Sequence, residues 1–251
     1  MRTLFLSIFI LLTACTAKPV QDKKMPSPLI SASTFLTEET KALQADEFSN
    51  PGFLWVESGK KIFQQDCQSC HNQNGEMREA AKHYPLYDSA SDKVINIENR
   101  INLCRTEQMD ATALPYESEP LLALTSYIRH QARGKSQTIL LDTKSQKHFD
   151  KGEIYFFARR GQFNLSCSQC HNNYWGQKLR GDTISQGHGN GFPAYRFEWE
   201  SLGSLHRRFA DCDRGVRAEP KALGSDEYSA LEFYLAHRAG NLPIETPAVR
   251  R

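Results

Sequence analysis

The sequence predicts a mainly α-helical protein made of two similar domains in tandem. Two pentapeptides of the form Cys-x-x-Cys-His, at residues 67–71 and 167–171, carry this prediction. An amphipathic segment with aromatic residues precedes each of them and opens near a glycine, Gly59 or Gly152. Each half closes with the same helical pattern of leucine and tyrosine, at residues 124–128 and 231–235. A pattern repeated in this way indicates a duplicated structural unit.

Length and composition set the broad class. The chain has 251 residues, of which 39% are hydrophobic, so it can bury the core of one or two domains and is not disordered as a whole. Its 31 Lys and Arg residues nearly balance 29 Asp and Glu residues, which gives a net charge of +2. Without a basic run, the sequence predicts no nucleic-acid partner.

The first residues predict an export signal, residues 1–14. The apolar run at residues 4–12 is too short for a membrane helix, which needs about 20 residues. It ends in Leu12-Thr13-Ala14-Cys15, which resembles the lipobox of bacterial lipoproteins. That resemblance implies a periplasmic protein anchored to a membrane by a lipid on Cys15; the alternative is an ordinary secretory signal in which Cys15 is incidental. Residues 15–48 are largely polar and predict a tether that runs into a docking segment.

The two pentapeptides have the attachment signature of haem c. The thiols of Cys67 and Cys70 would attach one haem group, and those of Cys167 and Cys170 a second. The histidines that follow, His71 and His171, would bind the iron. A four-thiolate zinc site is the main competitor, but the pairs lie far apart and zinc does not require the histidine. A redox dithiol does not require it either. We therefore expect two haem c groups per chain.

The order of elements in each half resembles the class I cytochrome c fold. A helix, the haem peptide, a long loop and a final aromatic helix follow one another twice, which predicts domains at residues 49–136 and 144–251, the second one catalytic. The polar join contains Arg133-Gly134-Lys135-Ser136, which lacks the first half of a phosphate-binding loop and is expected to end a helix.

The second ligand of each iron is the next question. No methionine follows Met109, so the second domain has none to offer, whereas Met109 is possible in the first. Two cysteines remain, Cys104 and Cys212, and each ends an apolar pattern spaced as one helix face, at residues 94, 97, 101, 104 and 202, 205, 209, 212. A thiolate ligand would stabilise ferric iron and lower the potential. The alternatives are buried free thiols or a disulfide between Cys104 and Cys212.

An arginine stands four residues before each spare cysteine. Arg208 could hold an anion beside Cys212 and favour its thiolate form. Arg100 precedes Cys104 in the same way, and either arginine could instead pair with a haem propionate. Spacing alone does not choose the catalytic haem.

Longer strings point to a family. They are Asn50-Pro51-Gly52-Phe53-Leu54-Trp55-Val56, Arg100 to Cys104, Gly189-Asn190-Gly191-Phe192-Pro193-Ala194-Tyr195-Arg196, Arg207-Arg208-Phe209-Ala210-Asp211-Cys212, Val216-Arg217-Ala218-Glu219-Pro220 and Pro247-Ala248-Val249-Arg250-Arg251. With them the chain resembles the SoxA family, the larger subunit of the SoxAX thiosulfate-oxidising cytochromes. The resemblance covers nearly all of the chain after the signal segment.

The resemblance implies a haem-dependent L-cysteine S-thiosulfotransferase. In this family the carboxy-terminal haem is the active one, with His171 and Cys212 as axial ligands, and Cys212 can carry an extra sulfur as a persulfide. Thiosulfate is joined oxidatively to the cysteine of a SoxYZ-type carrier, and two electrons leave through haem to an acceptor cytochrome c. A small SoxX-type cytochrome completes the site. A cationic pocket containing Arg208 would position the substrate.

Two other functions stay open from the residues alone. One is a dihaem electron carrier without sulfur catalysis, whose ligands only tune the potential. The other is a dihaem peroxidase, which requires a displaceable sixth ligand and is disfavoured by two well-placed cysteines. His188, His206 and His237 are expected at the surface or as supports of a ligand.

Overall fold

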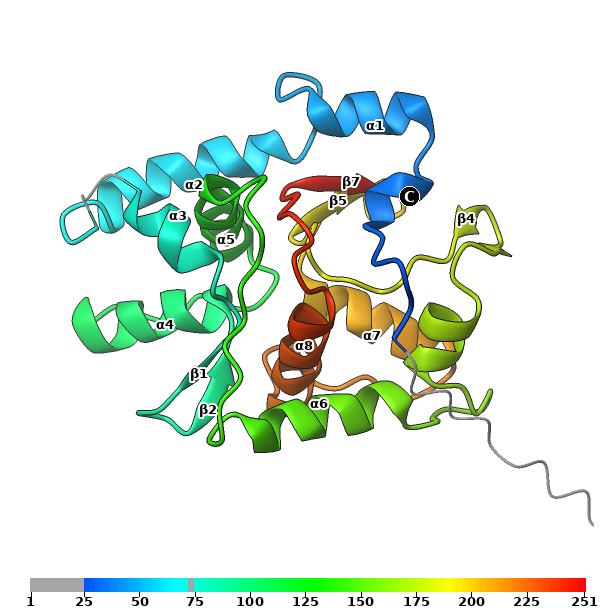
Figure 1. The fold of residues 1–251 in the computed structure, drawn as a ribbon. Coiled ribbons are helices and arrows are strands. Elements are labelled where there is room, and N and C mark those ends of the chain that lie inside the picture. The colour runs from blue at the N-terminus through cyan, green and yellow to red at the C-terminus, as the bar shows by residue number, and fades with distance from the viewer. Residues whose placement is uncertain (1–24, 72–74) are drawn as a thin grey trace, which may run out of the picture.

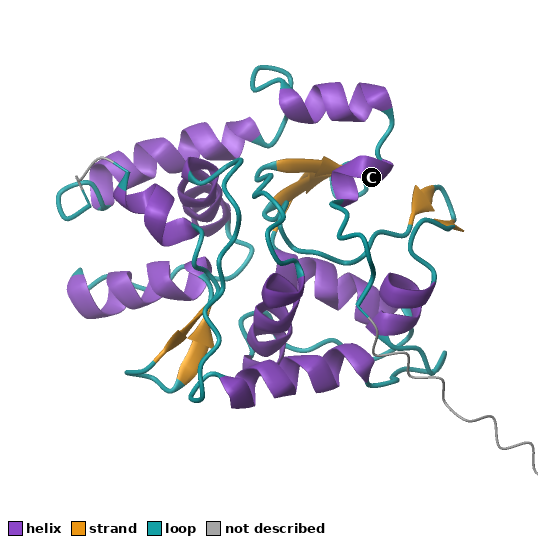
Figure 2. Ribbon diagram, viewed as in Figure 1, coloured by secondary structure: helices purple, strands orange, loops and turns teal. Residues whose placement is uncertain are grey.

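The computed structural model describes residues 25–71 and 75–251. The predicted signal peptide at residues 1–14 and the predicted lipid attachment at Cys15 lie outside these residues. Helices dominate the fold and the strands are short (Figure 2). The prediction of a mainly helical protein is confirmed. In Figure 1 the helices of the two halves lie side by side, with a small sheet of strands β5 and β7 above the second half.

In its described residues, the first half contains four helices and one hairpin. Its elements are α2 (Phe53–Asp66), α3 (Glu76–Ala81), β1 (Leu86–Asp88), β2 (Lys93–Ile95), α4 (Ile97–Gln108) and α5 (Glu119–Gln131). Helix α2 packs along α5, and β1 pairs with β2 antiparallel, with Tyr87 opposite Val94. Helix α5 ends at Gln131, and Gly134 follows with a left-handed φ of 79°, so the helix stop predicted at this join is confirmed.

The second half repeats this plan and adds two small sheets. Its elements are α6 (Gln146–Phe157), the π-helical turn η2 (Gln169–Asn173), β3 (Lys178–Leu179), β4 (Asp182–Thr183), β5 (Ala194–Arg196), β6 (Ser201–Gly203), α7 (Leu205–Gly215), α8 (Asp226–Arg238) and β7 (Ala248–Arg250). Helix α6 packs along α8, as α2 does along α5. Strand β5 is central in its sheet, antiparallel to β6 and parallel to β7.

The same close helix crossing occurs in both halves. A Cβ atom on Gly59 would lie 2.0 Å from the carbonyl oxygen of Ala123, and one on Gly152 would lie 2.0 Å from that of Ala230. Only glycine fits where two helix backbones approach so closely. The expectation that these glycines open their helices is wrong, because both lie inside helices, α2 and α6, at the point of contact.

The apolar stripes that end at the spare cysteines are only partly helical. Val94 lies in β2 and Leu202 in β6, and the helices begin afterwards, at Ile97 and Leu205. In each half a polar N-cap stops the helix from extending backwards: the Asn96 side chain accepts from the amide of Asn99, and Ser204 accepts from that of Arg207. The expectation of four residues on one helix is therefore corrected to a strand residue followed by three on a helix face.

The segment before the first domain is docked on the second. It contains the 3-10 helix η1 (Ala32–Phe35) and α1 (Glu38–Ala45). Ser31 and Ser33 both donate to Glu245, and the Gln44 carboxamide accepts from the amide of Val249 at 3.1 Å. Of the tether and docking segment predicted for residues 15–48, the described part is thus held by specific hydrogen bonds, more extensively than its polar composition indicates.

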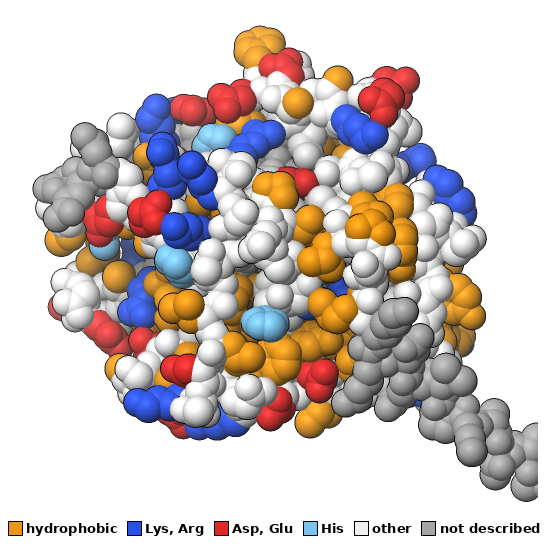
Figure 3. All heavy atoms as spheres, viewed as in Figure 1, with side chains coloured by type: hydrophobic (Ala, Val, Ile, Leu, Met, Phe, Trp, Pro, Cys, Tyr) orange, Lys and Arg blue, Asp and Glu red, His pale blue; other side chains and the backbone are white. Residues whose placement is uncertain are grey.

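The face shown in Figure 3 carries basic and acidic side chains near one another rather than one continuous basic field. This distribution agrees with the small net charge of +2. Among the described residues, no helix combines the length and apolar character needed to cross a membrane.

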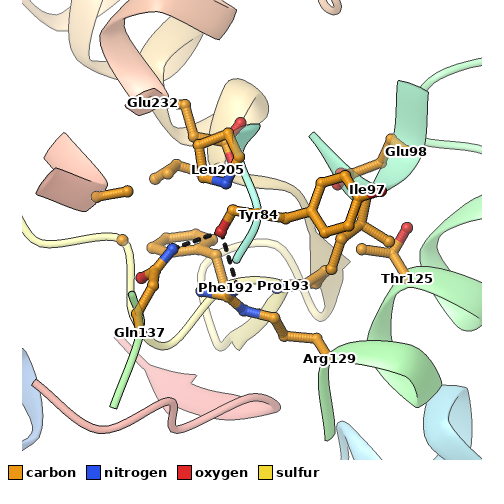
Figure 4. A pocket seen from close by; sticks show the side chains of 13 residues that line it. Tyr84, Ile97, Glu98, Thr125, Arg129, Gln137, Phe192, Pro193, Leu205 and Glu232 are labelled. Carbon is orange, nitrogen blue, oxygen red and sulfur yellow. Dashed lines mark hydrogen bonds between the residues drawn. The ribbon is translucent and has the colours of Figure 1, made fainter. Parts of the chain in front are cut away.

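A small cavity of about 30 Å³, lined by both apolar and charged side chains, lies where the two halves meet. Glu98 and Arg129 line it from the first half and Glu232 from the second (Figure 4). The volume is enough for one or two water molecules. Burial and the nearby Glu232 raise the pKa of Glu98 to about 8, and burial lowers that of Arg129 to about 10. The protonated form of Glu98 is thus the stable one in the folded protein near neutral pH.

Glu98 should make the stability of the protein depend on pH. Its folded pKa of about 8 exceeds the ordinary value of 4.5, so the folded state binds the proton more tightly, and the free energy of unfolding should fall as pH rises through this window. The slope from one proton is at most about 1.4 kcal/mol per pH unit. In chemical denaturation, Glu98→Gln should make the free energy of unfolding less dependent on pH between the ordinary and the folded pKa of Glu98. Glu107→Gln, at an exposed position on the same helix, should not change this dependence. An unchanged slope in Glu98→Gln would contradict the assignment.

Candidate functional site

The first Cys-x-x-Cys-His peptide follows directly from helix α2, which ends at Asp66. Cys104, on α4, is close enough for its charge to contribute to the raised pKa of Cys67, whose main cause is burial. His71 Nδ1 lies 2.9 Å from Glu76 Oε1, which leaves Nε2 for a second partner. The structure thus brings Cys104 to the peptide of its own half, as its position in the repeat predicts.

The second peptide is held more tightly. His171 lies in the π-helical turn, where its Nδ1 donates to the carbonyl oxygen of Ser185 at 2.7 Å. A Cβ on Gly187 would lie 2.8 Å from the His171 ring, so glycine lets the backbone close against the imidazole. Burial, together with the charges of Arg238 and Arg208, lowers the pKa of His171 to about 4. His171 is therefore a neutral imidazole whose Nε2 lone pair is free to bind a metal.

Cys212 lies beside this second peptide. After burial, which is the largest cause, its charge contributes to the raised pKa of both Cys167 and Cys170. The described cysteines are all free thiols, so Cys104 and Cys212 do not form the disulfide considered from the sequence. Each spare thiol instead stands next to one Cys-x-x-Cys-His peptide.

The donor set fits haem c rather than zinc. Each peptide offers two free thiols and one imidazole nitrogen, with a third thiol nearby, which is what covalent attachment and axial ligation require. Within the described ranges, no three or more His, Cys, Asp or Glu side chains converge as they would around a bare metal ion.

An aspartate next to Cys212 is the centre of a buried hydrogen-bond network that the sequence did not indicate. Asp213 is 3% exposed and accepts from Tyr155 and Tyr228, each at 2.7 Å. Arg160 donates to Asp213 at 3.1 Å and to the sulfur of Cys167 at 3.6 Å. The network fixes the last turn of α7, and with it Cys212, relative to the attachment peptide. Its members come from two separate stretches of the chain, at residues 155–160 and 213–228, and share no local pattern.

The corresponding place in the first half carries the opposite arrangement of charge. Arg105 follows Cys104, as Asp213 follows Cys212, and it pairs with Asp66 at 3.7 Å just before Cys67. Arg105 also donates to the carbonyl oxygen of Thr112. Asp66 is half exposed at 41%, so this pair is weaker than the buried pair of the second half. The two halves therefore share the location of an ion pair but not its strength.

The two arginines that precede the spare cysteines differ in their partners. Arg100 donates to the hydroxyl of Tyr84 at 3.1 Å and to Asp88 at 3.1 Å. The half-buried side chain of Arg208 has neither a hydrogen bond nor an ion pair with any residue that the structure describes. The charge of Cys212 is the largest cause of the raised pKa of Arg208. Arg208 is therefore a cation beside Cys212 with unused donors, whereas Arg100 is already neutralised.

Arg238 is a further buried cation that sequence reasoning missed. It donates to the carbonyl oxygen of Gln186 and to Asn172 Oδ1, each at 2.5 Å, and lies over the ring of Phe156 at 4.9 Å. Gln186 in turn bonds Pro28 of the docked segment. Arg238 thus ties helix α8 to the loop that holds His171.

The three histidines expected at the surface or as supports of a ligand differ in burial. His237 is exposed, but His188 and His206 are buried. His206 pairs with Glu232 at 3.0 Å and stacks on Tyr116 of the first half. Of the two positions expected for them, the surface is therefore ruled out for His188 and His206, and a supporting position remains.

A mainly helical fold, paired thiols each followed by a histidine, and a free thiol beside each pair together define a c-type cytochrome. A family model described as the SoxA/TsdA cytochrome c domain matches residues 54–136. The chain is also 41% identical to the L-cysteine S-thiosulfotransferase subunit SoxA of Pseudaminobacter salicylatoxidans, over 88% of this chain and 81% of that protein. The chain belongs to the SoxA family, as the sequence predicts.

Two further comparisons agree. The subunit of the same name from Rhodovulum sulfidophilum is 36% identical over 88% of this chain and 79% of its own length. A crystal structure of SoxXA from P. pantotrophus superposes with a TM-score of 0.84 at 31% identity, covering 89% of this chain and 87% of that one. The fold, including the second half that the family model does not reach, is therefore that of SoxA.

Proposed function

We propose that the chain is a thiosulfate-conjugating enzyme with two haem c groups, one in each of two cytochrome domains at residues 49–136 and 144–251. Cys67 and Cys70 attach the first group and Cys167 and Cys170 the second. The iron ligands are two histidine and cysteine pairs, namely His71 with Cys104 and His171 with Cys212. The free thiols beside each peptide and the neutral imidazole of His171 support this assignment.

The reaction joins thiosulfate to a cysteine of a carrier protein of the SoxYZ type. A thiolate of the carrier and the terminal sulfur of thiosulfate form a sulfur–sulfur bond, which releases two electrons and leaves a cysteine S-thiosulfonate. Haem c supplies one-electron acceptance when bound, so the second electron needs a further acceptor. Cys212 presents its sulfur to the substrate, and Arg208 holds the dianion against it.

The unpaired state of Arg208 is the observation that carries this function. Both arginines have the same spacing to a cysteine, but Asp88 and Tyr84 occupy the donors of Arg100. The donors of Arg208 remain available beside Cys212 for an anionic substrate. The second half is therefore the catalytic one, and the first relays electrons.

The partners follow from the reaction and from the relatives. A SoxX-type small cytochrome is the partner that the SoxXA structure suggests, and an acceptor cytochrome c removes the electrons. Haem c is attached outside the cytoplasm, which supports a periplasmic location. Anchoring through a lipid on Cys15 remains a proposal from the sequence, and we infer no nucleic-acid partner.

Arg208→Gln should raise the KM for thiosulfate and lower kcat/KM about tenfold or more, because a charge-assisted contact with the substrate is lost. The assay mixes the haem-loaded protein, its small cytochrome partner, carrier and ferric acceptor, and measures the thiosulfonate mass added to the carrier. Arg100→Gln is the matched control and should leave the KM for thiosulfate unchanged. Equal changes in the KM for thiosulfate in both variants would indicate that Arg208 binds a haem propionate instead, and would favour a plain electron carrier.

A further inference from the structure

A second arginine lies near Arg208 on a different element. Arg196 is the last residue of strand β5, whereas Arg208 lies on α7. The charge of Arg208 helps to lower the pKa of Arg196, after burial as the main cause. Arg196 also stacks over Trp199, whose indole is held by Asp211 on α7, so it reaches the turn of α7 that carries Arg208 and Cys212.

Arg196 is buried and incompletely paired. It is 6% exposed, and its Nε has no hydrogen-bond partner among the described residues. Its one ion pair within the described part of the chain joins Nη2 to Glu198 at 3.3 Å. The Glu198 side chain is 65% exposed, so water screens this partner. A buried donor without a partner costs free energy unless another group accepts from it.

The surroundings of Arg196 do not supply that acceptor. Its guanidinium lies over the ring of Trp199 at 5.2 Å, but Arg207 lies closer to the same ring, at 4.3 Å. The indole of Trp199 donates to Asp211 at 2.9 Å, which fixes the ring on α7. Stacking therefore orients Arg196 but leaves its Nε unsatisfied.

We propose that Arg196 is a second substrate-binding residue, which together with Arg208 binds the sulfonate end of thiosulfate. This inference rests on the proposed function. A dianion is matched by two cations, and a planar guanidinium can donate two parallel hydrogen bonds to sulfonate oxygens. With the sulfonate held by two arginines, the terminal sulfur is the end left to face Cys212. Arg196 thus helps to select a doubly charged substrate and to orient it so that its terminal sulfur reacts.

The test is equilibrium binding of thiosulfate to the haem-loaded protein with its small cytochrome partner and without carrier, so that no turnover occurs. Arg196→Gln should weaken binding, measured by calorimetry, about tenfold, and raise the KM in the carrier assay by a similar factor. Arg196→Lys keeps the charge but loses the planar guanidinium, so its affinity for thiosulfate should lie between those of the parent and of Arg196→Gln. Arg207→Gln, which removes the other arginine over Trp199, is the control and should bind thiosulfate normally. Unchanged binding in Arg196→Gln overturns the proposal.

Glu198→Gln provides a test of opposite sign that does not disturb the buried arginine. It removes the carboxylate that partly neutralises Arg196, so thiosulfate should bind more tightly, by a few-fold. Weaker or unchanged binding would overturn the proposal even if Arg196→Gln failed to fold. Failure of the proposed function looks different, because Cys212→Ala would then retain conjugation whatever the Arg196 variants do.

Discussion

Cys212→Ala should abolish transfer of thiosulfate to the carrier while both haem groups stay attached. Attachment needs the thiols of Cys167 and Cys170, which the substitution leaves intact. Conjugation needs a sulfur at the place where Arg208 holds the substrate, and alanine removes it. We expect the rate of thiosulfonate formation to fall about 1,000-fold or more, because the sulfur that faces the bound substrate is lost. Intact mass should still show two haem additions.

Electron paramagnetic resonance separates the role of Cys212 as an iron ligand from its role in binding. The oxidised protein should show two low-spin signals with thiolate character, and Cys212→Ala should remove one of them. The matched variant is Cys104→Met, which should remove the other signal, raise the potential of the first haem and reduce conjugation only modestly. Full activity in Cys212→Ala would refute the mechanism. Complete loss in Cys104→Met would mean that the catalytic haem is the first one.

Much of the site could be predicted because the chemistry lies in short local strings. The Cys-x-x-Cys-His spacing places two thiols and a histidine close together, so the residues proposed to attach haem can be read from the sequence. Cys104 and Cys212 were found because the chain is duplicated, and the structure places each beside the peptide of its own half. When a pattern occurs twice, residues at equivalent positions of the two copies can be expected to play the same role, even before the tertiary structure is known.

The copies alone could not decide which half is catalytic. Arg100 and Arg208 have the same spacing, and only the fold brings Asp88 to the first and leaves the second unpaired. Arg196 stood in one of the family strings, but no role could be assigned to it, because its place beside α7 depends on the packing of β5 and Trp199. Contacts of this kind depend on tertiary packing, and no local periodicity records them.

The prediction that each apolar stripe lies on a single helix was wrong for a different reason. Spacing assigned Val94 and Leu202 to the same helices as the cysteines. However, Asn96 and Ser204 are the N-caps of α4 and α7, so each helix begins only after them. Strands can continue an apolar stripe because a strand residue just before the helix can face the same core. Capping signals were present in the sequence and outweighed periodicity.

Gly152→Ala should destabilise the protein strongly, although alanine favours helices more than glycine. The gain in helix propensity is about 1 kcal/mol. Against it, the added Cβ would lie 2.0 Å from the carbonyl oxygen of Ala230 and 2.7 Å from the Tyr234 Cβ, so α6 and α8 would have to separate. Backbone atoms cannot move aside as a flexible side chain can, and we expect a net loss of about 2–3 kcal/mol. Thermal unfolding should then begin about 5–10 °C lower.

Gly59→Ala tests the duplication, since its Cβ would meet the carbonyl oxygen of Ala123 at the same 2.0 Å. Gly215→Ala is the control: it lies at the end of α7 with nothing within 4 Å of the added atom, and its melting temperature should stay within a degree or two of the parent. If each half carries its own haem, Gly152→Ala should first perturb the haem signal that depends on Cys212, and Gly59→Ala the one that depends on Cys104. Loss of both signals together in either variant would show that the halves unfold as one unit, because Ile244 of the second half packs in the core of the first.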